Sequence, residues 1–183
     1  MPRREAIAVL RDTLVSDDLF EALRVLNDTT DYRFTGIYLF DGPWVKSVLL
    51  FDRECPNVQI GHDVLWDDSY CRMAATDAGV FEVTDALADA RLATHAARRA
   101  VQCYCAVVLR SPDGKPLGTL CHYDVLPRMT APQTFATLKE MQPQVQQLLW
   151  TRLTAVTESI ESRLQHFAPH DQGLETVIPP AAR

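Results

Sequence analysis

Three cysteines and a histidine gather in two neighbouring segments of the sequence, where they could in principle bind a soft metal ion. Cys103 and Cys105 lie in one β-rich segment, and Cys121 and His122 lie in the next. Structural zinc sites usually take their ligands from tight loops with spacings such as Cys-x-x-Cys, a pattern these residues lack. Adjacent strand residues also face opposite sides of a sheet. We therefore predict no metal site and expect Cys105 and Cys121 to contact each other as reduced thiols.

Cys71, in the tripeptide Ser69-Tyr70-Cys71, is the thiol whose position most invites a catalytic interpretation. A cysteine that attacks a substrate must be accessible, have a lowered pKa and have a second cysteine nearby to resolve the product. The five cysteines are odd in number and irregularly spaced, which indicates reduced thiols and no disulfide framework. We predict that Cys71 packs beneath a sheet, and we keep a thiol-based redox enzyme or redox sensor as the alternative.

The elements that would position these residues can be predicted from hydrophobic periodicity and turn signals. Asp41-Gly42-Pro43 separates two β-rich runs and predicts a hairpin, and Gly79 is placed to end a helix. In chain order we expect one or two helices over residues 4–27, strands over 32–40 and 45–51, a possible short strand over 57–61, a helix over 66–78, a strand over 80–84, and a loop or short helix over 85–100.

A second hairpin is predicted around Ser111-Pro112-Asp113-Gly114-Lys115. Pro112 suits the second position of a type I turn and Gly114 the left-handed position that follows, which gives a three-residue loop with a bulge. This loop would place Cys105 opposite Cys121, Cys103 opposite Tyr123 and Val107 opposite Thr119. A two-residue Asp-Gly turn would shift the register by one and set Cys105 against His122, but it would put Pro112 where the ladder needs an amide donor.

A long helix is predicted over residues 131–167, because apolar residues recur there at steps of three and four. Pro143 removes a backbone hydrogen bond, so we expect a kink or a restart at that residue. The apolar stripe from residue 149 to 167 needs a covering surface. A second copy of the helix is the preferred supplier, which predicts a homodimer through the terminal helices, and the chain's own first helix is the alternative. Residues 168–183 are predicted to be disordered.

The segment Gly118-Thr119-Leu120-Cys121-His122-Tyr123-Asp124-Val125-Leu126-Pro127-Arg128 resembles the motif that closes a GAF domain. The strand and turn over residues 102–116 match this family in order and spacing, and residues 68–71 and 80–86 resemble its central helix and the strand after it. The resemblance covers roughly residues 16 to 150, with a GAF domain assigned to residues 1–150. Ala106 and Val108 stand where the family usually has Gly and Pro, at positions that face its ligand cavity.

This resemblance implies an α+β fold with an antiparallel sheet of five or six strands. The terminal helices would pack on one face, and the central helix with its loops would pack on the other, with residues 85–100 as a wall or lid over a cavity. Cys71 matches a cysteine of the free methionine-R-sulfoxide reductases, which are redox-active GAF proteins. The nucleophilic cysteine that these enzymes carry before the penultimate strand has no counterpart in residues 89–98, and the motif residues of cyclic-nucleotide-binding members are also missing. The resemblance therefore names no cofactor.

Length, charge and hydropathy exclude several classes of function. The 183 residues, 47% of them hydrophobic, suit one core with a helical extension. A formal net charge of -6 disfavours contact with nucleic acid. The sequence contains neither a signal-like apolar start nor a run of 18 apolar residues, so we expect a cytoplasmic protein without a membrane partner.

The prediction that unites these observations is a sensory or regulatory domain. It would bind an unidentified small molecule between sheet and loops, and signal through helix-mediated dimerisation or a separate signalling protein. Arginines of the segment 85–100 could hold an anionic ligand. The resemblance also implies that a haem or bilin could be attached in this segment, where His95 is the candidate, but we expect His95 to be a solvated loop residue. The candidate pocket residues are Trp66, Tyr70, Cys71, Arg91, His95, Tyr104 and Cys121, with Trp44 and Phe51 as further aromatic candidates.

Overall fold

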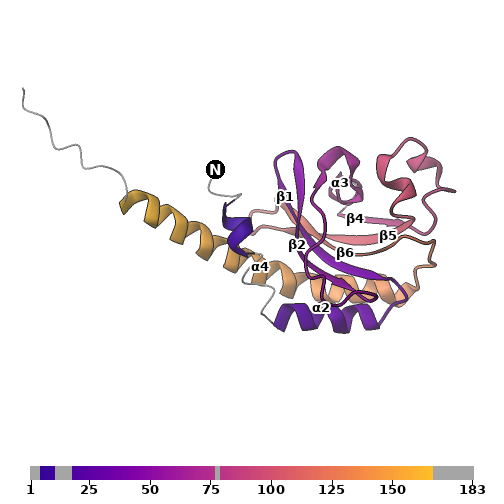
Figure 1. Ribbon diagram of the computed structural model, residues 1–183, viewed down its shortest axis with the longest axis horizontal. Helices are drawn as coiled ribbons and strands as arrows, with labels where there is room; N and C mark the ends of the chain where they lie inside the picture. Colours follow the sequence, from indigo (N-terminus) through magenta and orange to yellow (C-terminus); the bar gives the residue numbers. More distant parts are fainter. Residues whose placement is uncertain (1–4, 11–17, 77–78, 167–183) are drawn as a thin grey trace, which may run out of the picture.

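In the computed structural model, which describes residues 5–10, 18–76 and 79–166, six strands pair in one antiparallel sheet (Figure 1). Across the sheet their order is β3-β2-β1-β6-β5-β4, so the two hairpins meet at the centre through β1 and β6. The predicted α+β class with five or six antiparallel strands is confirmed. In chain order the strands are β1 (Phe34–Asp41), β2 (Trp44–Asp52), β3 (Val64–Leu65), β4 (Val80–Val83), β5 (Cys103–Arg110) and β6 (Pro116–Asp124).

Helices cover both faces of the sheet, as Figure 1 shows. Helices α2 (Asp18–Asp28) and α4 (Pro132–His166) lie on one face, and α3 (Tyr70–Thr76) lies on the other. Each face has its own core, because side chains alternate along every strand. Three short 3₁₀ turns accompany α3, namely η1 (Trp66–Asp68), η2 (Ala90–Leu92) and η3 (Ala96–Arg99).

The first hairpin is confirmed, and Gly42 in its turn has a positive φ of 58°. The short third strand lies at Val64–Leu65 and not at residues 57–61, where it was predicted. Val64 and Leu65 pair with the start of β2, whereas residues 57–61 form no ladder with it. They reach β2 through the Gln59 carbonyl, which accepts from the Leu50 amide (2.8 Å), and through the Gly61 amide, which donates to the Ser47 hydroxyl (2.8 Å). A Cβ at Gly61 would lie 3.0 Å from the Tyr38 hydroxyl, which is a tight contact.

The predicted helix over residues 66–78 is divided into η1 and α3 by Ser69, whose backbone is extended. The Ser69 hydroxyl donates to the Trp66 carbonyl (3.2 Å) and accepts from the Arg72 amide (3.3 Å), so this residue closes one turn and caps the next helix. Residues 77 and 78 lie outside the described residues. Gly79 follows with a φ of 82°, in agreement with its predicted role before β4.

The turn between β5 and β6 is the predicted three-residue loop. The Ser111 amide donates to the Lys115 carbonyl (2.9 Å), the Gly114 amide donates to the Ser111 carbonyl (2.8 Å), and Gly114 has a φ of 81°. A second irregularity follows immediately, because Arg110 pairs with Pro116 while Leu109 pairs with Gly118. Pro116 has no amide hydrogen to continue the ladder, and Leu117 is the extra residue of a bulge.

This bulge makes the predicted register wrong by one residue. Cys105 pairs with His122, Cys103 with Asp124 and Val107 with Leu120. A shift of one residue exchanges the faces of a whole strand. Cys105 therefore packs on the face of α2 and α4, Cys121 packs on the face of α3, and the predicted contact between these two thiols is wrong.

Helix α4 runs for 35 residues and continues through Pro143, so no second helix starts there, and a kink at this residue stays a prediction. Gln142 donates to the Val108 carbonyl (2.6 Å), and Gln146 accepts from the Arg110 amide (2.7 Å), which joins the helix to β5. Ala6, Ile7 and Leu10 of the helical residues 5–10 share a core with Leu149, Leu153 and Ile160 of α4. The chain's own first helix thus covers part of the apolar stripe. The predicted tail, residues 168–183, lies outside the described residues.

Candidate functional site

A cavity of about 270 Å³ lies between the sheet, the start of α3 and the segment that leads into β5. Its size is close to the lower end of the range of roughly 300–1,000 Å³ that is usual for small-molecule sites. Its wall is mostly apolar, with four tyrosines from three strands and one helix. The lining residues are Tyr38, His62, Val64, Asp68, Ser69, Tyr70, Cys71, Ala97, Ala100, Val101, Tyr104 and Tyr123.

The hydroxyls of the four tyrosines are held by hydrogen bonds. Tyr38 and Tyr123, which reach the cavity from the central strands, bond to each other (2.9 Å). The Tyr104 hydroxyl donates to the Cys71 sulfur (3.2 Å), and the Tyr70 hydroxyl donates to the carbonyl of Val101 (3.2 Å). Burial raises the pKa of Tyr70 to about 12 and the pKa of Tyr104 well above its usual value, so these hydroxyls stay protonated.

Cys71 lies on α3 at the inner wall of this cavity and is only 5% exposed. Its sulfur accepts hydrogen bonds from the hydroxyls of Tyr104 and Thr119, both at 3.2 Å. These two donors favour the thiolate, but the loss of solvent outweighs them, and burial raises the pKa of the Cys71 thiol. Cys71 is therefore a buried, protonated thiol with two hydroxyls against its sulfur.

The segment over residues 85–100 forms one wall of the cavity through Ala97 and Ala100. His95 packs its ring against Tyr70 (4.6 Å between centroids), and its Nδ1 accepts from the Ala97 amide (3.2 Å). Burial lowers the pKa of His95. Arg98 ties the segment together, because its guanidinium donates to the carbonyl of Leu87 (2.9 Å) and to the carbonyl of Ala93.

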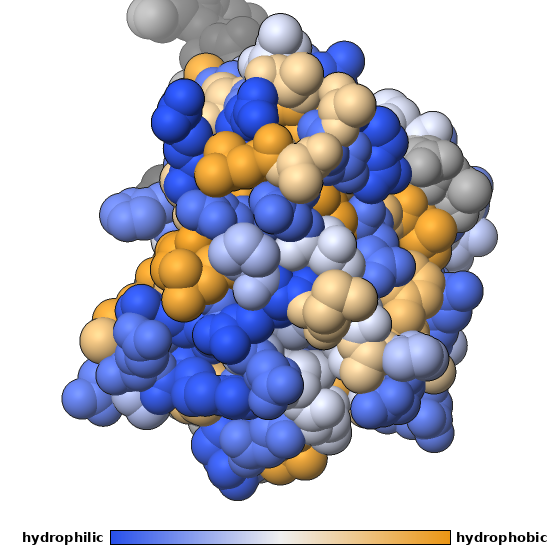
Figure 2. Space-filling model, turned by 90° about the vertical axis from the view of Figure 1, so that its right-hand side faces the viewer, coloured by the Kyte–Doolittle hydropathy of each residue, from blue (hydrophilic) through white to orange (hydrophobic). Residues whose placement is uncertain are grey.

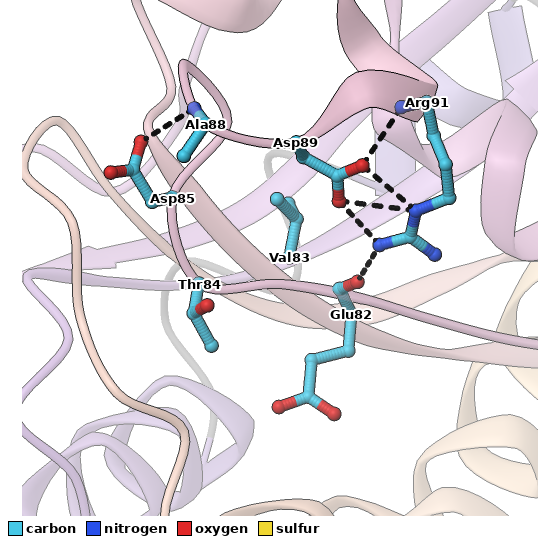
Figure 3. Close-up of a pocket in the computed structure, with 7 residues that line it drawn as sticks. All are labelled: Glu82, Val83, Thr84, Asp85, Ala88, Asp89 and Arg91. Carbon is cyan, nitrogen blue, oxygen red and sulfur yellow. Dashed lines mark hydrogen bonds and ion pairs between the residues drawn. The ribbon is translucent and has the colours of Figure 1, made fainter.

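Arg91 lies in a separate surface cleft of about 370 Å³ beside the edge strand β4, shown in Figure 3. Its guanidinium donates to both carboxylate oxygens of Asp89 and to the carbonyl of Glu82 (2.8 Å). Hydrogen bonding to Arg91 lowers the pKa of Asp89. Arg91 is thus engaged at the sheet edge and does not line the tyrosine-lined cavity. An anion clamp by the arginines of this segment stays a prediction.

The structure brings three of the seven predicted pocket residues to the cavity wall, namely Tyr70, Cys71 and Tyr104. Cys121 is buried in the same core, with its sulfur 3.6 Å from the Gly36 carbonyl. The remaining three do not line the cavity. The His95 ring packs against Tyr70, the Trp66 ring packs against Phe40 (4.8 Å between ring centroids), and Arg91 lies in the cleft beside β4.

Sequence reasoning missed Tyr38 and Tyr123 as wall residues and wrongly included Phe51. Phe51 packs on the opposite face, against Phe20 of α2 (5.9 Å between ring centroids). The signal for Tyr123 was present but was read in the wrong register, since the bulge at Leu117 had not been taken into account. Ala106 and Val108, the two departures from the family pattern, do belong to the core on the cavity face.

The molecular surface shows no single large apolar area on the side seen in Figure 2, where apolar residues form small patches among hydrophilic ones. No helix within residues 5–10, 18–76 and 79–166 combines the length and the hydropathy that a bilayer span requires. The tyrosine-lined cavity is the candidate site, because its wall is apolar and carries a few fixed polar groups.

Comparisons with known proteins identify the fold. No model of a protein family matches the sequence, and no curated protein is similar to it. Among solved structures, the type II free methionine-R-sulfoxide reductase of Thermoplasma acidophilum is 14% identical, with a TM-score of 0.54, over 82% of this chain and 96% of that chain. The free methionine-R-sulfoxide reductase of Neisseria meningitidis, solved in complex with its substrate, is 18% identical, with a TM-score of 0.54, over 86% of this chain and 91% of that chain.

A GAF domain from a protein of another kind is similar to a comparable extent. The GAF domain of the Acinetobacter phosphoenolpyruvate-protein phosphotransferase is 14% identical, with a TM-score of 0.51, over 86% of this chain and 93% of that chain. At such identities the likeness concerns the fold alone. The chain has the GAF-domain fold, as the motif around Gly118 predicted.

Proposed function

We propose that this protein is a sensory domain that binds a small molecule in the tyrosine-lined cavity. The observation that carries the proposal is the cavity itself, about 270 Å³ walled by four tyrosines whose hydroxyls are already hydrogen-bonded. An apolar pocket with a few fixed polar groups is the usual form of a small-molecule site. Because each tyrosine hydroxyl is held by a hydrogen bond to the protein, the cavity is formed before a ligand arrives, which lowers the entropic cost of binding.

The state of Cys71 favours a binding function over thiol chemistry. Two of the similar structures are sulfoxide reductases, so thiol chemistry is the alternative that needs an answer. An attacking cysteine must reach its substrate as a thiolate, whereas Cys71 is buried and burial raises its pKa. Its two hydroxyl neighbours fix the sulfur as part of the wall.

The output of such a sensor would travel through β5 and β6. These strands present Tyr104 and Tyr123 to the cavity and Cys105, Val107 and Leu120 to the opposite core, against which α4 packs. A ligand that moves these strands would change the packing of α4. Such a response requires different affinities for two states of the domain. Homodimerisation through the terminal helices, or a separate signalling protein, would then read the change.

A matched pair of variants tests the binding function. Ala97 lines the cavity, whereas its exposed neighbour Ala96 does not, so Ala97→Phe fills the cavity and Ala96→Phe adds the same ring outside it. We expect a fraction of the low-molecular-weight extract of cells to raise the melting temperature of the wild type and of Ala96→Phe, and not that of Ala97→Phe. Equal shifts in all three proteins, or a shift in none, would contradict the proposal.

The output is tested separately by light scattering and hydrogen exchange. We expect light scattering to give the mass of a dimer, and the active fraction to change the exchange of α4 amides in the wild type. Unchanged exchange in α4, together with a confirmed shift in melting temperature, would leave binding in place and remove α4 as the output.

A further inference from the structure

The wall of the tyrosine-lined cavity carries an acidic side chain and no Lys or Arg in the described part of the chain. Among the residues that line it in the described part of the chain, Asp68 is the only Asp, Glu, Lys or Arg. Asp68 is exposed and stands at the start of α3, where the wall meets solvent. The other ionisable group of the rim is the exposed imidazole of His62. A ligand carboxylate or phosphate would find no Lys or Arg in this wall.

The hydroxyls of the wall offer more acceptors than donors. The Tyr70 hydroxyl donates to the Val101 carbonyl, and the Tyr104 hydroxyl donates to the Cys71 sulfur. In the bond between Tyr38 and Tyr123, one hydroxyl donates and the other accepts. Each phenol oxygen keeps lone pairs, so the four tyrosines leave one free donor and several acceptors. The faces of tyrosine rings are also negative, because of the ring quadrupole. The wall therefore favours positive over negative charge.

The nearby basic residues lie outside the wall of the cavity. Arg72 forms an ion pair with Asp67 (3.4 Å). Arg98 donates to backbone carbonyls of its own segment, and its charge opposes the rise in the pKa of Tyr70 that burial causes. Arg99 is exposed. His95, behind Tyr70, has a pKa lowered by burial and is neutral at physiological pH.

We infer that the cavity accepts a small organic cation, an alkylated ammonium group that rests among the four tyrosines with Asp68 at the rim as its counter-charge. Aromatic rings attract a cation through their negative faces, and the attraction is strongest where water is excluded. An ammonium with alkyl groups suits an apolar wall better than a bare amine, which would lose its hydrogen bonds to water. This inference rests on the proposed binding function and names its ligand class.

The test compares a cation with a neutral molecule of the same shape. Calorimetric titrations with tetramethylammonium, choline and 3,3-dimethyl-1-butanol, the uncharged isostere of choline, measure affinity for the full chain. We expect choline to bind at least about tenfold more tightly than its isostere, given the strength of cation–ring contacts. Equal or tighter binding of the isostere would overturn the inference.

Two pairs of variants locate the effect. Asp68→Asn should weaken choline binding about fivefold and leave the isostere unchanged, whereas Glu140→Gln, which removes the same charge from the exposed side of α4, should leave both unchanged. Tyr70→Phe keeps the ring and should bind choline like the wild type, and Tyr70→Leu should lose most of the binding. Circular dichroism confirms that each variant is folded. Equal effects of Asp68→Asn and Glu140→Gln would also overturn the inference.

Failure of this inference can be told from failure of the proposed function. If no cation binds up to millimolar concentration while the cell extract still shifts the wild type and not Ala97→Phe, the cavity is a ligand site for another class and the cation inference is overturned. If the extract also has no effect on the wild type, both proposals fall.

Discussion

The two faces of the sheet are filled in different ways by the same strands. On the face of α2 and α4, aliphatic side chains such as Leu49, Val107 and Leu120 are packed without exposure. On the face of α3, tyrosines and small residues share the space and leave a cavity. A flexible aliphatic core can close over a gap, whereas tyrosines held in place by hydrogen bonds cannot. The fold thus separates a closely packed face from a face that contains a cavity.

The sharpest way to break both faces at once is Gly118→Ala. A Cβ at this position would lie 2.0 Å from the Tyr38 carbonyl oxygen, where β1 and β6 meet at the centre of the sheet. We expect a loss of about 3–5 kcal/mol in the free energy of unfolding, measured with urea. Gly114→Ala is the control, because its Cβ meets nothing within 4 Å and only its positive φ is unfavourable. It should cost about 1 kcal/mol.

A valine on each face measures the difference in packing directly. Val107 is fully buried against the helices, and Val64 is half-buried at the cavity. We expect Val107→Ala to lower the free energy of unfolding by about 2 kcal/mol, and Val64→Ala by under about 1 kcal/mol, since Val64 already borders a void. A larger loss for Val64→Ala would mean that the cavity face also depends on close packing.

On the face of α2 and α4, the buried residue His122 makes stability depend on pH. This residue is fully buried, and its Nδ1 lies 2.7 Å from the hydroxyl of Thr35, which also accepts a hydrogen bond from Asn27. Burial lowers the pKa of His122 from 6.5 to about 3, with a smaller contribution from Arg53. Below pH 6.5 the His122 imidazole is therefore protonated in the unfolded chain and stays neutral in the folded chain.

Acid should consequently weaken the fold through His122. The stabilisation is fully present above pH 6.5 and is lost as the pH falls toward about 3, by at most about 1.4 kcal/mol per pH unit. His122→Asn keeps an acceptor toward Thr35 but does not titrate. We expect its urea unfolding to depend less steeply on pH between 6.5 and 5 than that of the wild type. The same slope in both proteins would show that His122 does not titrate as described.

The smallest effect distinguishes the exposed thiol from the buried ones. Cys55 is exposed in the loop after β2, and the other four cysteines are buried on or beside the two faces. We expect a thiol reagent at neutral pH to modify one cysteine quickly, and Cys55→Ser to abolish this fast phase. A fast phase that persists in Cys55→Ser and disappears in Cys71→Ser would instead favour the thiol enzyme.

The fold could be predicted from sequence because its signals are local. Asp41-Gly42-Pro43 and the segment Ser111–Lys115 mark tight reversals between β-rich runs, and the three- and four-residue periodicity of residues 131–167 marks a helix. These patterns act through the backbone and survive in any tertiary context. The same is true of Tyr70 and Tyr104, whose elements could be placed without knowledge of register.

The rest of the site depends on irregularities that carry no clear sequence signal. The bulge at Leu117 places Cys121 in the core of the cavity face and Tyr123 at the cavity wall, and a register shift between Ile37 and Tyr38 accompanies the placement of Tyr38. One residue of slip exchanges the two faces, so the predicted register put Tyr104 and Tyr123 on opposite faces of the sheet. The prediction that Arg91 lines the cavity failed for a different reason. The position of a long loop side chain depends on its hydrogen-bond partners, which for Arg91 are Asp89 and the Glu82 carbonyl.

Native mass spectrometry of the intact protein, purified from cells and re-exposed to the low-molecular-weight extract, tests the central claim most directly. We predict a mass excess of one small molecule on the wild type and on Ala96→Phe, released when the protein is unfolded and absent from Ala97→Phe. A wild type that carries only the mass of the bare chain, or an adduct that persists equally in Ala97→Phe, would contradict the account of the cavity as a ligand site.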